Sequence, residues 1–417
     1  MNAKASSRQA GPAQGPTKVA PSSGPTQASL HLKPGKERSL LRRHPWIYAN
    51  AIERVRGQPE SGQTVRVVSA EGRFLAHAAY SPASSIRARA WSFDETAEID
   101  AHWMKARIHE AVTRRVDLQQ RTSAIRLVFG EADRLPGLVA DRYGDQLVVQ
   151  FLAAGVEFWR ESLVQALVEA TGCGAVYERS DAAARQREGL PSREGALLGP
   201  SPSPVQVIED GVNYRVDVVG GHKTGFYIDQ RDNRREVALH AAGRRVLNCF
   251  CYTGGFSLAA RKGGAAEVVS IDSSADALAL AAAHEPLNGF SEPSTWMQAN
   301  VFDALKAFQA EGRQFDLIVL DPPKFAPSVQ HLDRASRAYK DINMRALRLL
   351  APEGLLFTFS CSGAVSVDLF QKIVAGAVFD AGVDAQLLHR LSAGSDHPMA
   401  MTHPEGEYLK GLMLRRM

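Results

Sequence analysis

From about residue 234 to the C-terminus, short apolar runs alternate with segments of helical periodicity. A chain that alternates strands and helices in this way typically forms a parallel sheet with helices on both faces. The pattern therefore predicts a doubly wound α/β domain over residues 221–417. Its expected strands are Arg245–Phe250, Glu267–Ile271, Thr295–Gln298, Phe315–Leu320, Gly354–Phe359, Ala385–Leu388 and Tyr408–Leu414.

The region from about residue 31 to residue 93 has a different pattern, in which short strands with a period of two are separated by glycines. Examples are Thr64–Val68 and Ile86–Trp91. This pattern predicts a small β-barrel over residues 30–97, a size at which a domain can just fold alone. A helix is expected over residues 100–121, with basic residues on its polar positions: Lys105, Arg107, Arg114, Arg115 and Arg121.

Residues 98–220 are expected to hold this helix and a small α+β unit. Asp210-Gly211 is a strong hairpin signal between the strands Val205–Ile208 and Tyr214–Val218. The other expected elements are a helix at Phe158–Thr171 and strands at Arg126–Phe129, Gly137–Asp141, Gln146–Phe151 and Ala175–Arg179.

The first 29 residues contain four prolines, three glycines, five serines and no aromatic residue. Such a segment cannot bury enough apolar surface to offset its ordering entropy, so we expect a disordered tail. It has no continuous apolar stretch and is not a secretory signal. Its serines and missing acids would suit a transit peptide, but its arginine density is too low to favour one.

The overall composition is that of an ordinary globular protein. Hydrophobic residues make up 45% and charged residues 23% of the 417 residues, and no run approaches the 18 apolar residues of a membrane span. Four cysteines are too few for a disulfide scaffold and indicate a reducing compartment, so a cytoplasmic location is expected. The sequence leaves the oligomeric state open between a monomer and a homodimer.

The formal net charge of +4 is unevenly distributed. Residues 1–29 have three basic residues and no acid, whereas the chain beyond residue 56 is net negative. This asymmetry favours a nucleic-acid partner, although a solvated basic face would give the same pattern. Residues 30–56 hold two acids and seven basic residues: Lys33, Lys36, Arg38, Arg42, Arg43, Arg54 and Arg56.

The turn after the first α/β strand contains Gly254-Gly255, which would let the backbone approach a ligand ahead of a helix N-terminus. The turn lacks the full G-x-G-x-x-G pattern, so a dinucleotide is not strongly indicated. Asp272 ends the next strand, eighteen residues beyond Gly254. Its carboxylate could accept from both hydroxyls of a ribose, or it could cap the following helix; both interpretations stay open.

Two further acidic positions follow later strands. Asp303 could accept from an exocyclic amine and Phe302 could stack on a base, but capping and core packing explain both residues equally well. Asp321-Pro322-Pro323 is the sharpest local signal. Two prolines directly after a buried strand fix an extended turn and hold the Asp321 carboxylate at the sheet edge where α/β folds bind ligands.

Cys361 follows the fifth strand and is expected at the same edge as Asp321. An arbitrary cysteine is usually a small buried hydrophobe. Here the flanking serines and a helix that is expected to begin just after Cys361 would favour the thiolate and a nucleophilic role. Cys249 and Cys251 lack the partners of a zinc site, so they are expected to pack in the core and no metal site is expected.

At these residues the chain resembles the RlmI-type family of S-adenosylmethionine-dependent 23S rRNA cytosine-5 methyltransferases. The resemblance covers about residue 31 to the C-terminus, and His44-Pro45-Trp46 and Tyr80-Ser81-Pro82 resemble the family's N-terminal PUA domain, an RNA-binding module. The other matching stretches are residues 222–231 (HKTGFYIDQR), 250–256 (FCYTGGF), 321–325 (DPPKF), 360–362 (SCS) and 404–411 (PEGEYLKG).

The resemblance implies a class I methyltransferase domain in which Cys361 attacks cytosine C6 and Asp321 holds or protonates the N3/N4 edge. One departure is Asn248, where the family usually carries Asp, so Asn248 is not assigned a role. The expected RNA contacts are Lys33, Arg38, Arg42, Arg43 and Lys324. The expected contacts to S-adenosylmethionine are Gln230, Phe250, Tyr252, Thr253, Gly254, Asp272, Asp303 and Asp321.

Three alternatives remain at this stage. A guanine N-methyltransferase of rRNA would keep the fold but needs no cysteine nucleophile, so Ser360-Cys361-Ser362 favours cytosine C5. A non-catalytic RNA-binding assembly factor would not need Gly254, Asp272 and Asp321 together with Cys361. Methylation of a small molecule would leave the basic N-terminal region without a purpose.

Overall fold

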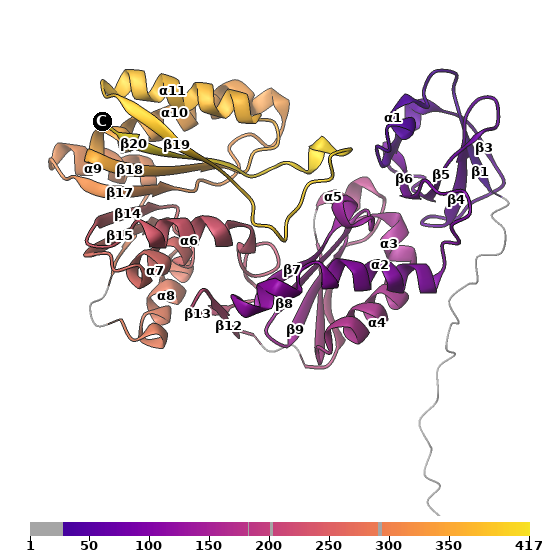
Figure 1. Ribbon diagram of the computed structural model, residues 1–417, viewed down its shortest axis with the longest axis horizontal. Coiled ribbons are helices and arrows are strands. Elements are labelled where there is room, and N and C mark those ends of the chain that lie inside the picture. The colour runs from indigo at the N-terminus through magenta and orange to yellow at the C-terminus, as the bar shows by residue number, and fades with distance from the viewer. Residues whose placement is uncertain (1–27, 182, 201–202, 291–293) are drawn as a thin grey trace, which may run out of the picture.

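The computed structural model describes residues 28–181, 183–200, 203–290 and 294–417 (Figure 1). The predicted disordered tail lies outside the described residues except at its end. There Ala28 is buried and Ser29 begins the first strand, so the predicted boundary at residue 29 is two residues too late. Figure 1 shows the N-terminal and C-terminal domains on opposite sides of a central one. No helix in the described part of the chain is both long and apolar enough to cross a bilayer.

The N-terminal domain is a six-stranded sheet in the order β2-β6-β5-β4-β1-β3, and its strands curl around one apolar core (Figure 1). The predicted period of two is confirmed on β4, where Val65 and Val67 are fully buried and Arg66 lies against the Phe74 ring. The elements are β1 (Ser29–Leu32), α1 (Arg38–Leu41), β2 (Trp46–Tyr48), β3 (Ile52–Arg56), β4 (Thr64–Val68), β5 (Phe74–Tyr80) and β6 (Ile86–Ser92).

The central domain has a five-stranded sheet in the order β11-β10-β9-β8-β7. The predicted strands are confirmed to within two residues, but β11 was not predicted because it is an exposed edge strand with no continuous apolar face. The elements are β7 (Ala124–Phe129), β8 (Leu138–Tyr143), β9 (Gln146–Phe151), α3 (Ala154–Phe158), α4 (Arg160–Thr171), β10 (Ala175–Ser180), α5 (Ala183–Arg187) and β11 (Arg193–Leu198).

The helix predicted over residues 100–121 is shorter. It is α2 (Ala101–Thr113), capped by Asp100, and a 3-10 turn over Val116–Gln120 follows. Arg115 therefore does not lie on a polar helix face as predicted. It is buried and forms a two-pronged ion pair with Asp133, with N···O distances of 2.9 and 2.8 Å.

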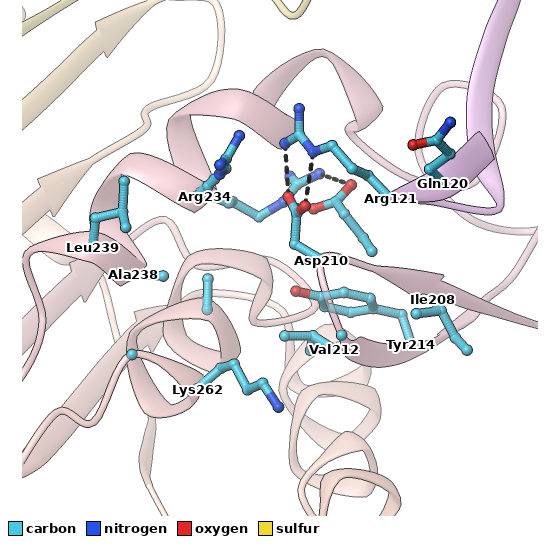
Figure 2. Close-up of a pocket in the computed structure, with 15 residues that line it drawn as sticks. Gln120, Arg121, Ile208, Asp210, Val212, Tyr214, Arg234, Ala238, Leu239 and Lys262 are labelled. Carbon is cyan, nitrogen blue, oxygen red and sulfur yellow. Dashed lines mark hydrogen bonds and ion pairs between the residues drawn. The ribbon is translucent and has the colours of Figure 1, made fainter. Parts of the chain in front are cut away.

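The predicted hairpin is β12 (Val205–Glu209) and β13 (Val212–Val216), so its second strand begins two residues earlier than predicted. Asp210 and Gly211 both have positive φ, 47° and 79°, as the tight turn requires. Figure 2 shows how the turn joins its neighbours: Arg121 donates to both Asp210 oxygens at 2.9 Å. Arg234 makes a similar buried pair with Glu209 beside a cavity of about 650 Å³.

The C-terminal domain has the predicted α/β architecture, a seven-stranded sheet in the order β16-β15-β14-β17-β18-β20-β19. The strands from β14 to β18 are parallel, and β20 runs antiparallel to both of its neighbours. The strands are β14 (Arg245–Cys249), β15 (Glu267–Asp272), β16 (Thr295–Gln298), β17 (Phe315–Leu320), β18 (Leu350–Ser360), β19 (Ala385–Ser392) and β20 (Lys410–Arg416).

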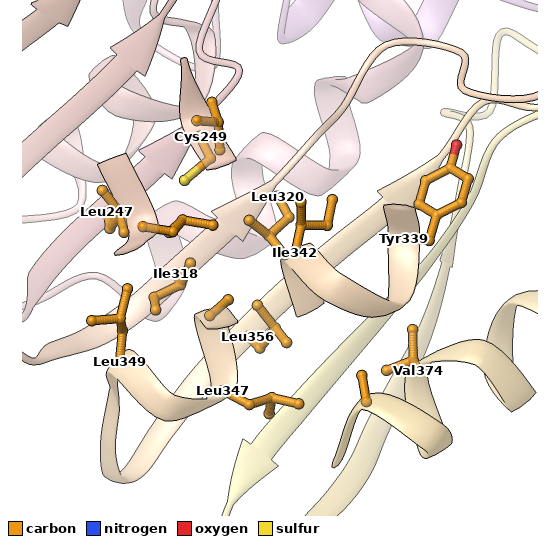
Figure 3. Close-up of a cluster of buried hydrophobic side chains, with 14 of the residues drawn as sticks. Leu247, Cys249, Ile318, Leu320, Tyr339, Ile342, Leu347, Leu349, Leu356 and Val374 are labelled. Carbon is orange, nitrogen blue, oxygen red and sulfur yellow. The ribbon is translucent and has the colours of Figure 1, made fainter. Parts of the chain in front are cut away.

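Alternate residues of the buried strands pack on opposite faces of this sheet. Leu247 and Cys249 belong to the core that α9, α10 and α11 cover, and Figure 3 shows them in one cluster with side chains of α10 and α11. Val246 belongs to the core on the other face, with α6 and α7. All four cysteines are free. The helices are α6 (Arg231–Leu239), α7 (Gly255–Lys262), α8 (Ala275–His284), α9 (Val301–Ala310), α10 (Leu332–Leu349) and α11 (Val367–Ala381).

The connection between β19 and β20, residues 393–409, extends from the C-terminal domain toward α1 of the N-terminal domain (Figure 1). Asp396 in this connection is fully buried and accepts from Arg231 on α6 at 2.7 Å and from the Arg126 backbone on β7 at 3.0 Å. Arg115 donates to its carbonyl oxygen. Asp396 thereby ties the connection to two domains at once.

We expect Asp396→Asn to lower the free energy of unfolding by about 3 kcal/mol, because the buried Arg231 guanidinium loses its nearer anionic partner and keeps only Glu209, at 3.7 Å. Urea denaturation measures the change. Asp368→Asn is the matched control, since it removes an exposed carboxylate paired with Lys372 and should change nothing measurable. Equal stability of the two variants would contradict the structural role of Asp396.

The same connection contacts the N-terminal domain directly. His44 Nε2 lies 3.2 Å from a Glu405 oxygen, and His403 Nδ1 lies 3.2 Å from the same oxygen, a spacing that a metal ion could also use. However, His44 Nδ1 accepts from the Trp46 backbone N–H, which leaves the proton on Nε2. His44 therefore donates to Glu405, and the group joins the two domains through hydrogen bonds.

Candidate active site

A cavity of about 800 Å³ lies at the carboxyl ends of β14, β15, β17 and β18. Parallel strands of an α/β sheet bring their carboxyl ends to one edge, where ligands commonly bind. Asp321 and Cys361, which follow two neighbouring strands, both line this cavity. The structure therefore brings together the two residues singled out as catalytic.

The turn between β14 and α7 forms one wall of the cavity. Phe250, Tyr252 and Gly254 all have positive φ, at 61°, 47° and 80°. A Cβ on Gly254 would lie 2.7 Å from the Trp296 ring, so only glycine fits there. Phe250, Tyr252 and Thr253 line the cavity, whereas Gly254 is not among the lining residues and acts through the shape of the turn.

Asp272 lies at the tip of β15 and lines the cavity. One carboxylate oxygen accepts from the Tyr252 backbone at 2.8 Å, and the other accepts from the Ser274 backbone at 2.9 Å. The residue that caps α8 is Ser274, not Asp272. The capping interpretation of Asp272 is therefore wrong, and its carboxylate is held at the cavity by the glycine-containing turn.

Asp303 lies on the first turn of α9 and is not among the residues that line the cavity. Its side chain is 76% exposed and pairs with Lys306. The cavity is lined instead by Phe302 and by Asn300, whose side chain caps α9. Asp303 does not line the cavity because α9 has already begun at Val301.

The segment before α6 forms the wall opposite the sheet edge. Asp229 is buried, and one of its oxygens accepts from Lys223 at 2.7 Å and from the Tyr408 hydroxyl at 2.6 Å. Burial opposes ionisation, but the charges of Lys223 and His397 hold the pKa of Asp229 well below its usual range. Its other oxygen has no hydrogen-bond partner among the described residues.

The charges of this segment also act on Asp321. Burial and the nearby Asp229 carboxylate raise the pKa of Asp321 to about 7, while Lys223 and a hydrogen bond from Gln230 oppose the shift. Gln230 is itself buried and lines the cavity. Near neutral pH, Asp321 can therefore hold a proton or release one.

The raised pKa of Asp321 predicts a pH dependence of stability. Its folded value of about 7 lies above the ordinary value of 3.8, so the carboxyl contributes stability below about pH 4 and loses it as the pH rises toward 7. We expect the free energy of unfolding of the wild type to fall by about 2–4 kcal/mol relative to Asp321→Asn over that range. Denaturant titrations at several pH values measure this difference. Asp303→Asn, which removes an exposed carboxyl, should keep the wild-type slope.

Cys361 follows β18, and its Sγ lies 3.9 Å from the Pro322 carbonyl oxygen. Burial raises the pKa of the thiol and the Asp321 carboxylate raises it further, whereas Lys223 and Lys324 lower it. The expected activation by a helix N-terminus is wrong, because α11 begins only at Val367 and its end is capped by Ser366. The thiol is the resting form.

Hydroxyl groups on both sides of Cys361 bind its loop to the loop that carries Asp321. Ser362 Oγ accepts from the Ala326 backbone at 3.1 Å and contacts the buried Tyr339 hydroxyl at 3.1 Å. Ser360 Oγ donates to the same hydroxyl at 3.0 Å. Tyr339 on α10 and the bond between Ser362 and Ala326 therefore hold the two loops in place relative to each other.

Lys410 holds the other side of the Cys361 loop. It lies opposite Ser360 on β20, is 4% exposed, and donates to the carbonyl oxygens of Ser362 at 2.7 Å and Val365 at 2.6 Å. Burial lowers the pKa of Lys410, while Glu407 and Cys361 act against that shift. A buried ammonium group thus lies within electrostatic reach of the candidate nucleophile.

Asn248, the departure from the family pattern, lies beneath the cavity and is not among its lining residues. It is fully buried, and its amide nitrogen donates to Ser257 Oγ at 2.8 Å. The amide nitrogen therefore supports Ser257 on α7, and the amide oxygen has no hydrogen-bond partner among the described residues.

The residues predicted to contact RNA are all exposed. Lys324 lies at the mouth of the cavity, next to Asp321 and its prolines. The remaining predicted contacts lie in the N-terminal domain, on or near α1: Lys33, Arg38, Arg42 and Arg43.

Sequence reasoning missed several residues of the site. Lys223, Tyr227 and Asp229 lie in a stretch that matched the family, but only Gln230 of that stretch was singled out. A dense run of charged and aromatic residues with no apolar periodicity was the available signal. Lys410 was also missed, although a single lysine inside an apolar strand is unusual enough to indicate a specific partner.

Comparison with known proteins agrees with this arrangement. The S-adenosylmethionine-dependent methyltransferase family matches residues 183–398, beginning inside the predicted central domain, and the PUA-like domain family matches residues 30–93. Ribosomal RNA large subunit methyltransferase I of Aeromonas hydrophila is 50% identical over 93% of this chain and 99% of the relative. The same-named protein of Tolumonas auensis is 48% identical over 93% and 99%.

Solved structures share the whole architecture. A candidate S-adenosylmethionine-dependent methyltransferase from Streptococcus mutans superposes with a TM-score of 0.79 at 24% identity, over 93% of this chain and 99% of its own. A related methyltransferase structure complexed with S-adenosylhomocysteine superposes with a TM-score of 0.80, also at 24% identity and over the same shares. This likeness shows the fold.

Proposed function

This chain belongs to the ribosomal RNA large subunit methyltransferase I family of S-adenosylmethionine-dependent enzymes, and from that premise we propose that it methylates C5 of a cytosine in 23S rRNA. The observation that carries the proposal is the pairing of Cys361 with Asp321 in one cavity. A thiol beside a carboxyl group that holds a proton near neutral pH suits covalent activation of a pyrimidine. Methylation of a guanine nitrogen has no use for such a thiol.

The residues of the cavity fit S-adenosylmethionine. Asp272, held at the tip of β15, would accept from the ribose hydroxyls, and the unpartnered oxygen of Asp229 would accept from the ammonium group. Phe250 and Phe302 offer aromatic surface for the adenine. The bound cofactor supplies an electrophilic methyl group on its sulfonium centre.

Cys361 and Asp321 would make C5 of the cytosine nucleophilic. Attack of the Cys361 thiolate on C6 forms an S–C6 bond and moves the ring electron pair toward C5. Asp321 would donate its proton to N3 or hold the N4 amine, which withdraws charge from the ring and assists the attack. After methyl transfer, the C5 proton passes to water, the S–C6 bond breaks to release the thiolate, and Asp321 recovers the proton from N3, which restores the aromatic ring.

The N-terminal domain would capture the RNA. Its match to the PUA-like family and its exposed basic residues near α1 support this role. Such residues neutralise phosphates, so RNA affinity should fall steeply with salt concentration. Residues 30–56 of this domain hold seven basic residues and two acids, a charge that would attract RNA phosphates.

The proposal is tested with rRNA in which cytosine is replaced by 5-fluorocytosine. Fluorine at C5 cannot leave as a proton does, so a covalent adduct with the protein should accumulate, resist denaturation and map to Cys361. Nucleoside mass spectrometry of rRNA from a deletion strain should show loss of one 5-methylcytosine. Loss of a methylguanosine instead, with no adduct, would overturn the proposal.

A further inference from the structure

A third cavity, of about 720 Å³, lies where the N-terminal domain, the central domain and the β19–β20 connection meet. Arg43 and Phe93 line it from the N-terminal side, Trp103 and Arg134 from the central domain, and Thr402 from the connection. It shares no lining residue with the active-site cavity. The role of this cavity is not explained by methyl transfer itself.

Two arginines in this cavity have the same unusual backbone. Arg43, just after α1, has φ of 61°, and Arg134, just after the 3-10 turn Gly130–Asp133, has φ of 60°. Bulky residues rarely adopt this left-handed conformation, and here both residues follow the end of a helical turn, where it serves as a cap. The two positions come from different domains yet face one cavity.

Neither guanidinium group is neutralised. Arg43 and Arg134 are exposed, and within residues 28–417, gaps excepted, their side chains form no hydrogen bond or ion pair. The cavity also carries two carboxylates, which bond to other neighbours. Asp94 accepts from Thr96 at 3.0 and 2.8 Å, and Glu131 accepts from the Trp46 indole at 2.8 Å and lies 3.9 Å from Arg89. Within the described residues neither carboxylate forms an ion pair with Arg43 or Arg134, so both guanidinium groups can bind an anion.

Aromatic side chains lie beside these charges. Trp103 and Phe93 are half-buried in the cavity wall, and the Arg107 guanidinium lies 5.3 Å from the centre of a Trp103 ring. Behind them, the indole nitrogen of the buried Trp91 has no hydrogen-bond partner among the described residues. A ligand with a negative charge and a flat ring would contact the two exposed arginines and the aromatic wall.

We infer that this cavity binds a single-stranded nucleotide of the RNA substrate, outside the active site. Arg43 and Arg134 contact its phosphates from two domains, and Trp103 stacks on its base. The inference rests on the proposed function only in taking RNA as the substrate. Because the cavity spans a domain junction, the bound RNA is held across it, which fixes the direction in which the strand leaves the PUA-like domain.

The test uses the full chain with Arg43→Asn, Arg134→Asn and the double variant, because asparagine tolerates the left-handed backbone. Arg73→Asn is the matched control, since Arg73 is exposed in the same N-terminal domain but does not line the cavity. The probe is a set of overlapping single-stranded 23S rRNA fragments, measured by fluorescence anisotropy. We expect affinity to fall roughly tenfold for each single variant. The slope of log affinity against log salt should fall by about 1.4 in the double variant.

Affinity and salt slope equal to those of Arg73→Asn would overturn the inference. Retention of RNA binding with loss of binding to an assembled ribosomal particle would also overturn it, in favour of a protein partner. Ultraviolet crosslinking gives a separate measure, and the crosslinked wild-type peptide should contain Trp103. Failure of the proposed function is distinguishable: absence of the 5-fluorocytosine adduct would refute cytosine C5 chemistry while the binding result stands.

Discussion

Cys361→Ala is expected to abolish methyl transfer, lowering kcat by at least about 10³-fold, while S-adenosylmethionine affinity stays close to wild type. The reason is that cytosine C5 is a poor nucleophile until a thiolate adds to C6. Two cysteines line the cavity, and Cys361 is the one next to Asp321 at the end of β18. The other is Cys251, which was expected to pack in the core; burial raises the pKa of its thiol well above the usual range, and Cys249 is fully buried in the core. Single-turnover methylation and isothermal titration with the cofactor measure the two effects.

Cys173→Ala is the matched control, because Cys173 is also a free cysteine but is buried in the core of the central domain. It should methylate RNA and form the 5-fluorocytosine adduct like the wild type. Methylation of cytosine C5 by Cys361→Ala at a rate near that of the control would exclude Cys361 as the nucleophile. Loss of cofactor binding as well would show that the substitution had disturbed the cavity.

The protonation of Cys361 and of Asp321 is coupled. The Asp321 carboxylate raises the pKa of the thiol, so protonation of Asp321 makes the thiolate easier to form. A cytosine whose N3 faces Asp321 favours the neutral, hydrogen-donating carboxyl. Substrate binding would therefore make Cys361 easier to ionise. Without RNA, the thiol would stay protonated and unreactive.

Alkylation of Cys361 by iodoacetamide in the free enzyme should accordingly be slow at pH 7 and rise with pH.

The sequence patterns predicted what is set by local chemistry. Apolar runs located all seven strands of the C-terminal sheet, and the rule that parallel strands end at one edge brought Asp321 and Cys361 together. Asp303 does not line the cavity, because it lies inside the first turn of α9 and Asn300, directly before the helix, lines the cavity instead. Activation of Cys361 by a helix N-terminus would require a helix that begins directly after it, whereas α11 begins only at Val367.

Other features depend on contacts between segments far apart in the chain. Asp229 lines the site because Lys223 and Tyr408 hold it there, and Tyr408 is 179 residues away. The edge strand β11 exists because β10 pairs with it. Neither hydrophobic periodicity nor turn chemistry contains this information, so only the folded structure reveals these residues.

Lys410→Met is expected to lower kcat by about 10²-fold with little change in cofactor affinity, because the Ser362 and Val365 carbonyls lose their donor and the Cys361 loop can shift. Methionine keeps the length of the side chain and suits the buried position, so the protein should remain folded. The lost ammonium charge should also raise the pKa of the Cys361 thiol and move its alkylation profile to higher pH.

Arg415→Met is the matched control for this variant. Arg415 lies on the same strand as Lys410, but its ion pair with Glu353 is exposed and distant from the loop, at 3.9 Å between the charged atoms. It should keep the wild-type rate and alkylation profile. Rate loss in Lys410→Met without a shift in the alkylation profile would mean that Lys410 acts only on loop geometry. A wild-type rate would show that Ser360, Ser362 and Tyr339 suffice to position the nucleophile, because those three side chains would then be the remaining support of the loop.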